Sequence, residues 1–252
     1  MPKAGRDRSL GTLAKKNALM TIDTSFNFQS DTPQDKDPDT WSPTLAKYHK
    51  YLWSKPLPDG RIFSLEYKKP PFYFHHCSDV GEFWLSSDTV VPSYRKRTIE
   101  GVTKDMMNFG GLGYTIGGMM VFPANKIDGK WTINQERGCT KSISDRFDLT
   151  VECIRRFYSG QTSPLTDVLN RYADFFALFR EFSGYVDFFH LQDIVSPDYS
   201  AVSYFSPFDE FGVSSPIPNT KDAYFEYRAY AIDFLNARNR RIQGWAEQNK
   251  MG

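Results

Sequence analysis

The spacing of apolar residues changes along this chain from a period of two to a helical period, and this change constrains the fold more than any other feature. Alternation of apolar and polar residues is typical of half-buried strands. It predicts strands over Arg61–Tyr67, Phe72–His76, Glu82–Val91, Gly113–Pro123 and Lys130–Arg137. The Asp128-Gly129 pair between the last two segments favours a hairpin turn.

Helical spacing dominates after Ser142. The segment Asp145–Tyr158 is followed by Gly160, a typical helix stop, and its apolar stripe consists of Phe147, Val151, Ile154 and Tyr158. The stripe predicts that Ile154 is buried. Further helices are predicted over Thr44–Trp53, Thr98–Phe109, Leu165–Phe182, Tyr185–Ile194 and Lys221–Asn249.

Strands that come first and helices that follow are typical of an α+β fold. We predict a mostly antiparallel sheet in the N-terminal half, with strands at about 61–91 and 113–137, and a helical C-terminal half packed on one face of it. Residues 27–252 are interpreted as a single α+β domain, because no linker interrupts them. Residues 1–26 are predicted to be a flexible basic tail, with an arm that binds nucleic acid as the alternative.

Composition excludes several classes of protein. The chain has 252 residues, and 31 Lys+Arg against 30 Asp+Glu give no general reason to expect a nucleic acid or a membrane as partner. No apolar run approaches the roughly 18 residues of a transmembrane helix. The three cysteines form no CxxC pair, which indicates a reducing compartment and no structural zinc. We therefore expect a soluble, cytoplasmic protein.

Motifs that identify common enzyme classes are missing from the chain: GxxxxGK[ST], HExxH and GxSxG. The stretch Gly110–Gly118 is rich in glycine but lacks the GxGxxG spacing, and predicts a strand with a close backbone approach. The sequence therefore does not identify a cofactor.

The segment Gln135–Arg156 carries the most chemistry. A turn at Gly138 is predicted to bring Lys141 to the start of the next helix, near Ser144 or Asp145. A helix N-terminus exposes free N–H groups and a partial positive charge, so it can bind an anion. We predict a phosphate site there, with the binding residues Arg137, Lys141, Arg146 and Arg155. In the alternative, Ser144 caps the helix and Asp145 complements its dipole.

Three acidic residues of the same helix, Asp145, Asp148 and Glu152, share one face. They could hold a divalent cation, or they form a solvated face in which Glu152 pairs with Arg155 or Arg156. We favour the second interpretation, so no metal ligand is predicted.

His76 and Asp88 are the predicted catalytic residues, with acid–base roles. Alternation in Glu82–Val91 places Asp88 on the less apolar face of the sheet. His76 adjoins the turn at Cys77–Gly81, and its neighbour His75 is the alternative that alternation itself favours.

A family resemblance extends over residues 35–63, GEFWLSSD at 81–88, GYTIGGMMVFPANKIDGKWTIN at 113–134, SDRFDLTVECIRRFY at 144–158, SPLTDVLNRYADFF at 163–176, GYVDFFHLQD at 184–193 and FLNARNRRI at 234–242. These stretches resemble a family of uncharacterised bacterial proteins of similar length. The resemblance covers most of residues 27–243. It implies a cytosolic bacterial protein with one full-length domain and no established activity, cofactor or partner.

Two hypotheses of function follow. The first is a cytosolic enzyme or sensor that acts on a phosphate-bearing ligand, a nucleotide or RNA, at the anion site. The alternative is a non-catalytic interaction protein or homo-oligomer that uses its aromatic helices at 165–194 and 221–249, since aromatic residues make up 16% of the chain. A large exposed aromatic patch would favour the alternative. A pocket lined by Arg137 and His76 would favour the enzyme.

Overall fold

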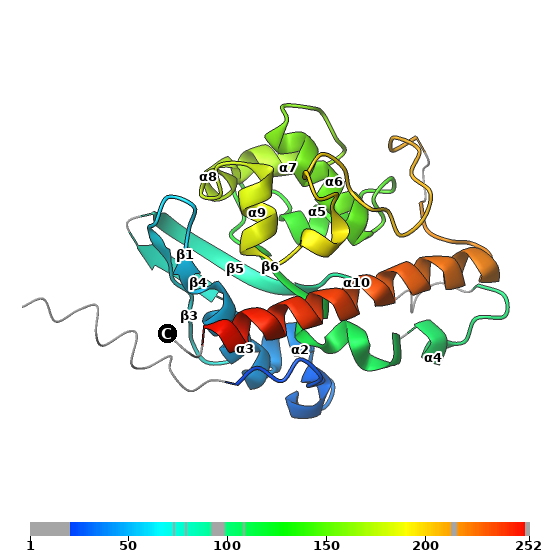
Figure 1. Ribbon diagram of the computed structural model, residues 1–252, viewed down its shortest axis with the longest axis horizontal. Helices are drawn as coiled ribbons and strands as arrows, with labels where there is room; N and C mark the ends of the chain where they lie inside the picture. Colours follow the sequence, from blue (N-terminus) through cyan, green and yellow to red (C-terminus); the bar gives the residue numbers. More distant parts are fainter. Residues whose placement is uncertain are drawn as a thin grey trace, which may run out of the picture.

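The chain folds into an antiparallel sheet surrounded by helices, which confirms the predicted α+β class (Figure 1). This computed structural model describes residues 21–249 apart from 73, 79, 92–98, 108 and 213–215. For residues 74–78, 104, 105 and 110 it describes the backbone alone. The strands lie in the N-terminal half, and one long helix occupies the C-terminal end of the described chain.

The main sheet has the strand order β3-β4-β5-β6, and every neighbouring pair is antiparallel. A separate two-stranded hairpin pairs β1 with β2. In chain order the strands are β1 (Lys55–Pro56), β2 (Ile62–Phe63), β3 (Glu66–Tyr67), β4 (Phe74–Ser78), β5 (Gly81–Thr89) and β6 (Met119–Pro123). The register places Ser87 opposite Val121 and Asp88 opposite Met120. The strands predicted over 72–76 and 82–91 are confirmed, with shifted ends.

The helices include several of a single turn. They are α2 (Pro38–Trp41), α3 (Pro43–Trp53), α4 (Lys104–Met107), α5 (Ile133–Cys139), α6 (Phe147–Tyr158), α7 (Thr166–Arg171), α8 (Ala173–Ala177), α9 (Phe182–Phe188) and α10 (Lys221–Gln248). Short 3-10 turns are η1 (Phe28–Asp31), η2 (Phe109–Tyr114), η3 (Ile116–Gly118) and η4 (Gln192–Ile194).

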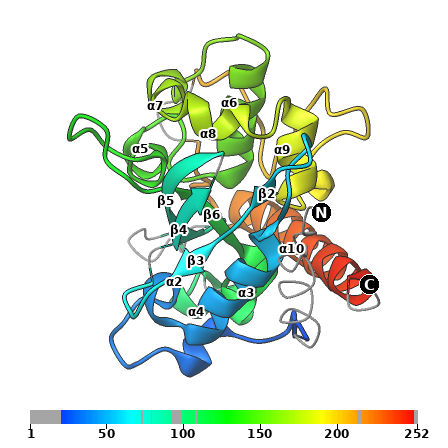
Figure 2. The same cartoon turned by 90° about the vertical axis from the view of Figure 1, so that its left-hand side faces the viewer.

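Helices cover both faces of the sheet, contrary to the prediction that they cover one. In Figures 1 and 2, α5–α9 form a group on one side of the strands, α2–α4 lie on the other side, and α10 runs between the two groups. From α3, His49 Nε2 lies 3.0 Å from Ser87 Oγ of β5. From α5, Arg137 Nη1 donates to Asp88 Oδ2 at 2.8 Å. Adjacent residues of a strand face opposite ways, so the two contacts mark two covered faces.

The aromatic residues of the 165–194 segment form part of the core. Phe175, Phe179, Tyr185 and Phe189 are at most 1% exposed. Their rings touch one another in tilted and edge-on pairs, with centres 4.9 Å apart for Tyr185 and Phe189 and 5.3 Å apart for Phe175 and Phe179. Such rings bury large apolar areas and also attract each other edge to face. The high aromatic content of this segment therefore serves packing.

The hairpin predicted over 113–137 is wrong after its turn, while before the turn the predicted strand is shortened to β6 and pairs with β5. Asp128 and Gly129 do form a turn with positive φ angles of 53° and 69°. The residues after it form helix α5, which opens with a capping box: Thr132 and Gln135 bind each other's backbone N–H groups. This reciprocal cap satisfies free donors and starts a helix where the apolar pattern had suggested a strand.

The glycine-rich stretch before β6 forms 3-10 turns and becomes a strand only at Met119. A Cβ atom on Gly117 would lie 2.6 Å from Asn239 Oδ1 and 2.7 Å from the Leu235 carbonyl oxygen, both on α10. The predicted close backbone approach is therefore confirmed. Glycine is required because α10 presses directly on this turn.

The predicted helix at 145–158 is confirmed as α6, and Ile154 is fully buried. It ends with Gly160 at a φ of 67°, whose N–H donates to the Phe157 carbonyl while the Gln161 N–H donates to the Arg156 carbonyl. These two bonds form a Schellman cap. The long final helix is confirmed as α10 and the one at 44–53 as α3.

Three other predicted elements are shorter than expected. Arg61–Tyr67 divides into β2 and β3 in different sheets, because the Leu65 N–H donates to Ser54 Oγ and leaves the ladder. The helix predicted over 165–182 divides at Tyr172, and α9 with η4 replaces the one predicted over 185–194. In 98–109 the described helix is α4, and residues 98 and 108 lie outside the description.

The folded part of the chain begins earlier than the predicted tail boundary. Ile22 is 1% exposed in the core and Phe26 packs against it, so residues 22–26 belong to the folded structure. Residues 1–20 of the predicted tail lie outside the described residues. Across the described part of the chain, none of the helices combines the length and the apolar character needed to span a bilayer.

Candidate functional site

Arg137 is the centre of a charged cluster at one end of β5. It donates to Asp88 Oδ2 at 2.8 Å and lies 3.1 Å from Asp145 Oδ1. The Arg137 side chain is fully buried, whereas the Asp88 and Asp145 side chains are 24% and 38% exposed. Its Nε also donates to Thr150 Oγ1 at 3.2 Å. The structure therefore brings the predicted binding residue Arg137 together with the predicted catalytic residue Asp88.

Asp39 of α2 adds a third carboxyl group to this cluster. Its Oδ1 atom is buried and has no hydrogen-bond partner among the described residues. Burial raises the pKa of Asp39 well above its usual value, and the nearby charge of Asp88 raises it further. Burial also raises the pKa of Asp88 to about 6, against the attraction of Arg137. Neighbouring carboxyl groups of this kind keep a proton closer to neutral pH than an ordinary aspartate does.

The side chain of His76, the other predicted catalytic residue, lies outside the described part of the structure, as does that of His75. The backbone of His76 lies in β4 opposite Phe83. Ser87 and Asp88 face opposite sides of the sheet, since Ser87 is buried toward α3 and Asp88 faces α5, and helices cover both sides. A contact between His76 and Asp88 stays a prediction.

Arg146 does not face the Arg137 cluster. Its side chain is fully buried in an ion pair with Asp148, whose carboxylate oxygens accept from Nε and Nη2. It also donates to the carbonyl oxygens of Ser206 and Pro216, each at 3.0 Å. These bonds use the guanidinium to hold Ser206 and Pro216 against α6.

Arg155 and Arg156 both bind Glu152, as the paired interpretation of the acidic face predicts. Arg155 donates through Nε and Nη2 at 2.8 Å, and Arg156 through Nε at 2.7 Å. Glu152 itself is almost fully buried, so its two partners neutralise a carboxylate that water does not reach. Lys141 is exposed in the turn before α6. The predicted phosphate-binding residues Arg137, Lys141, Arg146 and Arg155 therefore do not meet at one site in the structure.

The turn before α6 differs from the predicted cap. Ser144 and Asp145 have positive φ angles of 49° and 65°, and α6 begins at Phe147 without a side-chain cap. Ser144 Oγ donates to the Lys141 carbonyl instead. The carboxylate of Asp145 lies against Arg137, so it fills the place that an anion would take beside this guanidinium.

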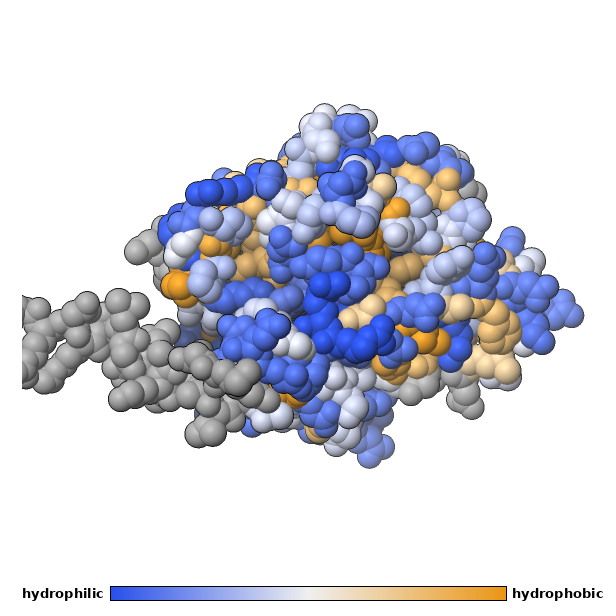
Figure 3. All heavy atoms as spheres, viewed as in Figure 1, coloured by the Kyte–Doolittle hydropathy of each residue, from blue (hydrophilic) through white to orange (hydrophobic). Residues whose placement is uncertain are grey.

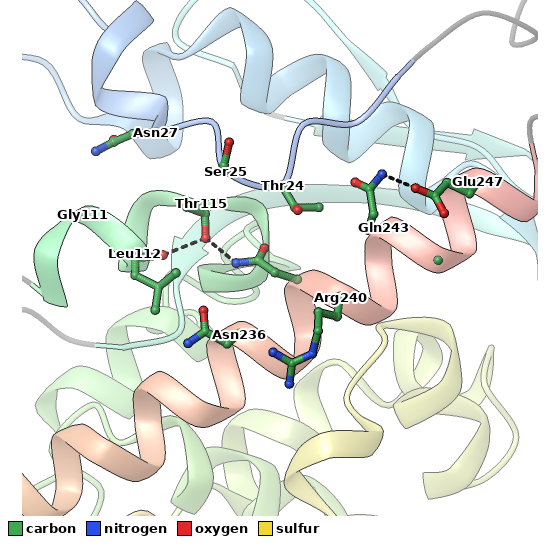
Figure 4. A pocket seen from close by; sticks show the side chains of 12 residues that line it. Thr24, Ser25, Asn27, Gly111, Leu112, Thr115, Asn236, Arg240, Gln243 and Glu247 are labelled. Carbon is green, nitrogen blue, oxygen red and sulfur yellow. Dashed lines mark hydrogen bonds between the residues drawn. The ribbon is translucent and has the colours of Figure 1, made fainter.

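A polar pocket of about 600 Å³ lies apart from these residues, between α10, the η2–η3 turn and the start of the folded chain (Figure 4). The residues that line it include several with hydroxyl or amide groups: Thr24, Ser25, Asn27, Thr115, Asn236 and Gln243. Figure 4 shows Thr24 and Ser25 on the segment that faces α10, with Asn236, Arg240 and Gln243 on α10 itself. A concave site with several converging polar groups is the usual form of a small-molecule site.

Hydrogen bonds fix the inner wall of this pocket. Asn239 Oδ1 accepts from the Gly117 N–H at 2.7 Å, and its Nδ2 donates to Thr115 Oγ1 at 2.9 Å. Toward the end of α10, Gln243 Nε2 donates to Glu247 Oε1 at 2.6 Å. The wall is therefore formed before any ligand arrives, which lowers the entropy cost of binding.

Arg240 supplies a positive charge at the rim of this pocket. Figure 3 shows that hydrophilic residues gather along the middle of α10 on this face. Arg240 also borders a second cavity of about 380 Å³, together with Asp193 and Asp233. Within the described residues no ion pair includes Arg240, and Asp193 binds the neighbouring Arg241 at 2.8 Å. Arg240 thus differs from Arg137, Arg146 and Arg155, each of which binds a carboxylate.

Sequence reasoning missed this pocket. One signal was visible, because Asn236, Arg240, Gln243 and Glu247 recur at helical spacing in a predicted helix and form a polar stripe. The facing wall was not visible, since Thr115 and Asn239 are separated by 124 positions. No group of three or more His, Cys, Asp and Glu side chains arranged to hold a metal ion occurs among the described residues.

Comparison with known proteins places the chain in a family. A model described as "Family of unknown function (DUF6994)" matches residues 22–242. No curated protein and no solved structure matches the chain. The resemblance to a family without established activity is thereby confirmed.

Proposed function

Since the chain belongs to this family of unknown function, we propose its function from its own residues: it binds a small phosphate-bearing ligand in the polar pocket beside α10. The contacts around each arginine carry this proposal. Arg240 lines the pocket without a carboxylate partner in the described structure, whereas Arg137, Arg146 and Arg155 each pair with a carboxylate. A guanidinium binds phosphate through paired, charge-assisted hydrogen bonds.

The rest of the pocket suits the remainder of a nucleotide. Its volume of about 600 Å³ lies within the range of small-molecule sites. Side chains of Thr24, Asn236 and Gln243 offer donors and acceptors for hydroxyl groups of a sugar or for the edge of a base. A mononucleotide therefore fits this proposal better than RNA, whose binding depends on many phosphate contacts at once.

This proposal retains the cytoplasmic enzyme or sensor and moves its anion site from the Arg137 segment to Arg240. A reducing, cytoplasmic compartment supplies free nucleotides and suits Cys139 and Cys153, which are free thiols. The acid–base roles of His76 and Asp88 are not part of this proposal, because neither is among the described residues that line the pocket beside α10.

Calorimetric titration of the full chain with nucleoside monophosphates and diphosphates tests the proposal, with the matching nucleosides as controls. We expect the phosphorylated forms to bind and the nucleosides to bind at least about tenfold more weakly, because a charged hydrogen bond contributes about 1.5–3 kcal/mol. Arg240→Ala should lower the affinity for the phosphorylated form by about tenfold or more. Binding should also weaken as salt is raised.

Lys141→Ala is the matched control, because it removes an exposed cation from the anion site predicted by sequence. It should leave the affinity unchanged. Gly244→Leu adds a side chain where a Cβ has open space at the pocket wall, and should block binding without removing a charge. Loss of binding in Lys141→Ala with full binding in Arg240→Ala would move the site back to the α5–α6 turn. Failure of every phosphate compound to bind would reject the ligand class.

The interaction hypothesis lacks the observation that would favour it. Its aromatic helices place Phe175, Phe176, Phe179 and Phe189 inside the core. Of the exposed aromatic side chains that the structure describes, Trp84, Trp131 and Tyr230, only Tyr230 belongs to these helices, and one exposed ring is common on protein surfaces. The pocket beside α10 therefore supports ligand binding better than the aromatic residues support a partner surface.

A further inference from the structure

Lys55 occupies an unusual place for a lysine. It follows α3 in strand β1, and its Nζ lies 3.1 Å from Nε2 of His190. Three aromatic ring centres surround the same atom, at 4.7 Å for Phe188, 5.1 Å for Trp245 and 5.2 Å for Trp53. Three aromatic rings and one imidazole therefore surround the amine of the Lys55 side chain.

A separate pocket of about 530 Å³ adjoins this lysine. The chain after Lys55 lines it with Pro56, Leu57 and Pro58, α9 contributes Phe188, and the end of α10 contributes Trp245. In Figure 2 the hairpin that carries β2 lies beside α9, which agrees with this lining. A pocket in which an amine lies beside proline and aromatic side chains can hold a small uncharged molecule next to a nucleophile.

Besides His190, the charged and titratable groups around Lys55 lie on α10, on α9 and just before α9. Arg238 of α10 and the burial of the amine favour its neutral form, while Asp187 of α9 favours its charged form. Glu181, just before α9, also lines the pocket. Burial is the main cause that lowers the pKa of Lys55 to about 7.

His190 orients the amine of Lys55. Burial first, and then the charge of Lys55, lower its pKa to about 2, so its imidazole is neutral. A neutral imidazole with an unprotonated Nε2 accepts a hydrogen bond from the amine and orients it. A half-buried lysine with a large neutral fraction near pH 7 is the state in which lysine acts as a nucleophile.

We propose that Lys55 forms a Schiff base with an uncharged aldehyde or ketone that enters the pocket between β1, α9 and the end of α10. The Nζ lone pair attacks the carbonyl carbon and gives a carbinolamine. The C–O bond of the carbinolamine then breaks, and the oxygen leaves as water with both protons of the amine. A C=N bond to Lys55 remains, so no oxidant or reductant is needed. The carboxylates of Asp187 and Glu181 beside the pocket disfavour carbonyl compounds that carry a negative charge.

Reductive labelling of the unaltered full chain tests this site. The protein is treated with benzaldehyde and cyanoborohydride at pH 7, which converts each imine into a stable benzylamine, and labelled peptides are quantified by mass spectrometry. Lys55 should be labelled at least about tenfold faster than the exposed Lys126 and Lys130, because an ordinary lysine is almost fully protonated at this pH. Labelling of Lys55 should level off above about pH 7, while that of the exposed lysines continues to rise.

The aromatic rings also attract an ammonium group, and this attraction would favour the charged form of Lys55. A charged Lys55 is the result that would contradict the proposal. If the rings hold Lys55 permanently charged, its labelling at pH 7 will be no faster than that of Lys126, and the proposal is overturned. A second measurement compares glyoxylate with benzaldehyde, and faster labelling of Lys55 by the anionic aldehyde would overturn the ligand class. Arg240→Ala should leave the labelling of Lys55 unchanged, so the nucleotide proposal and this one fail separately.

Discussion

The guanidinium groups of Arg137 and Arg146 are fully buried, and each lies against an aspartate. A buried charge is tolerated when partners satisfy it, so the function of an arginine depends on the carboxylates that the fold brings to it. Asp88 and Asp145 reach Arg137, whereas no described carboxylate forms an ion pair with Arg240. Residue type alone therefore could not separate a structural arginine from one that is free to bind a ligand.

Asp39→Asn should change how stability depends on pH. The native pKa values of Asp39 and Asp88 are raised, so the native state holds these protons more tightly than the unfolded chain. Their contribution to stability is present below about pH 4 and is lost as the pH rises through the native pKa values. The variant lacks one of these carboxyl groups, so it loses less stability as the pH rises. Its unfolding free energy relative to the natural chain should therefore increase from pH 4 to pH 7, by up to about 1.4 kcal/mol per pH unit.

Urea denaturation at several pH values measures this difference. Asp174→Asn on α8 is the matched control, because Asp174 is exposed and should give a flat difference. A flat difference for Asp39→Asn as well would mean that Asp39 titrates as an ordinary aspartate.

Among the elements, α6 and α5 illustrate what a local pattern can and cannot predict. The α6 stripe, with Gly160 after it, predicted a helix that the structure confirms, since one buried face specifies a helical period. The α5 residues alternate in polarity and suggested a strand. Thr132 and Gln135 carried the better signal, a capping box at the spacing that starts a helix. Short elements are decided by such caps more than by their apolar pattern.

Ile154→Ala should destabilise the protein by about 2–5 kcal/mol, because Ile154 is fully buried on the core side of α6 and its removal leaves a cavity. Chemical denaturation followed by circular dichroism measures the loss. Gln161→Ala, at an exposed residue after the end of α6, is the control and should cost no more than about 0.5 kcal/mol. A similarly small loss for Ile154→Ala would show that the core relaxes around this position.

At the scale of the whole molecule, Arg238 of α10 connects parts that are distant in sequence. Its Nη1 donates to the carbonyl oxygens of Gly117 and Met119, at 2.9 and 2.7 Å, and its Nη2 donates to that of Phe189 at 3.1 Å. β6 is the edge strand of the sheet and all of its residues are buried, so a carbonyl at its start needs a partner other than water. Such long-range pairing, like the pocket wall between Thr115 and Asn239, has no local pattern and could not be predicted from the sequence.

Arg238→Met should destabilise the protein by about 2–4 kcal/mol, because it leaves buried carbonyl groups unpaired. The expected result is a lower urea midpoint in a single transition, since one core contains residues from both halves of the chain. Arg228→Met on the same helix is the control, because Arg228 donates to one exposed carbonyl, that of Met106. An unchanged midpoint for Arg238→Met would show that apolar packing replaces the guanidinium without loss.

The position of α10 determines when the pocket can form during synthesis of the chain. The polar pocket uses residues 24–27 at the start of the folded chain and residues 236–247 in its last helix. Residues 24–27 are therefore synthesised well before residues 236–247, and the pocket is complete only after α10 has left the ribosome. Under the proposed function, a nascent chain that still lacks α10 therefore cannot bind the ligand in this pocket.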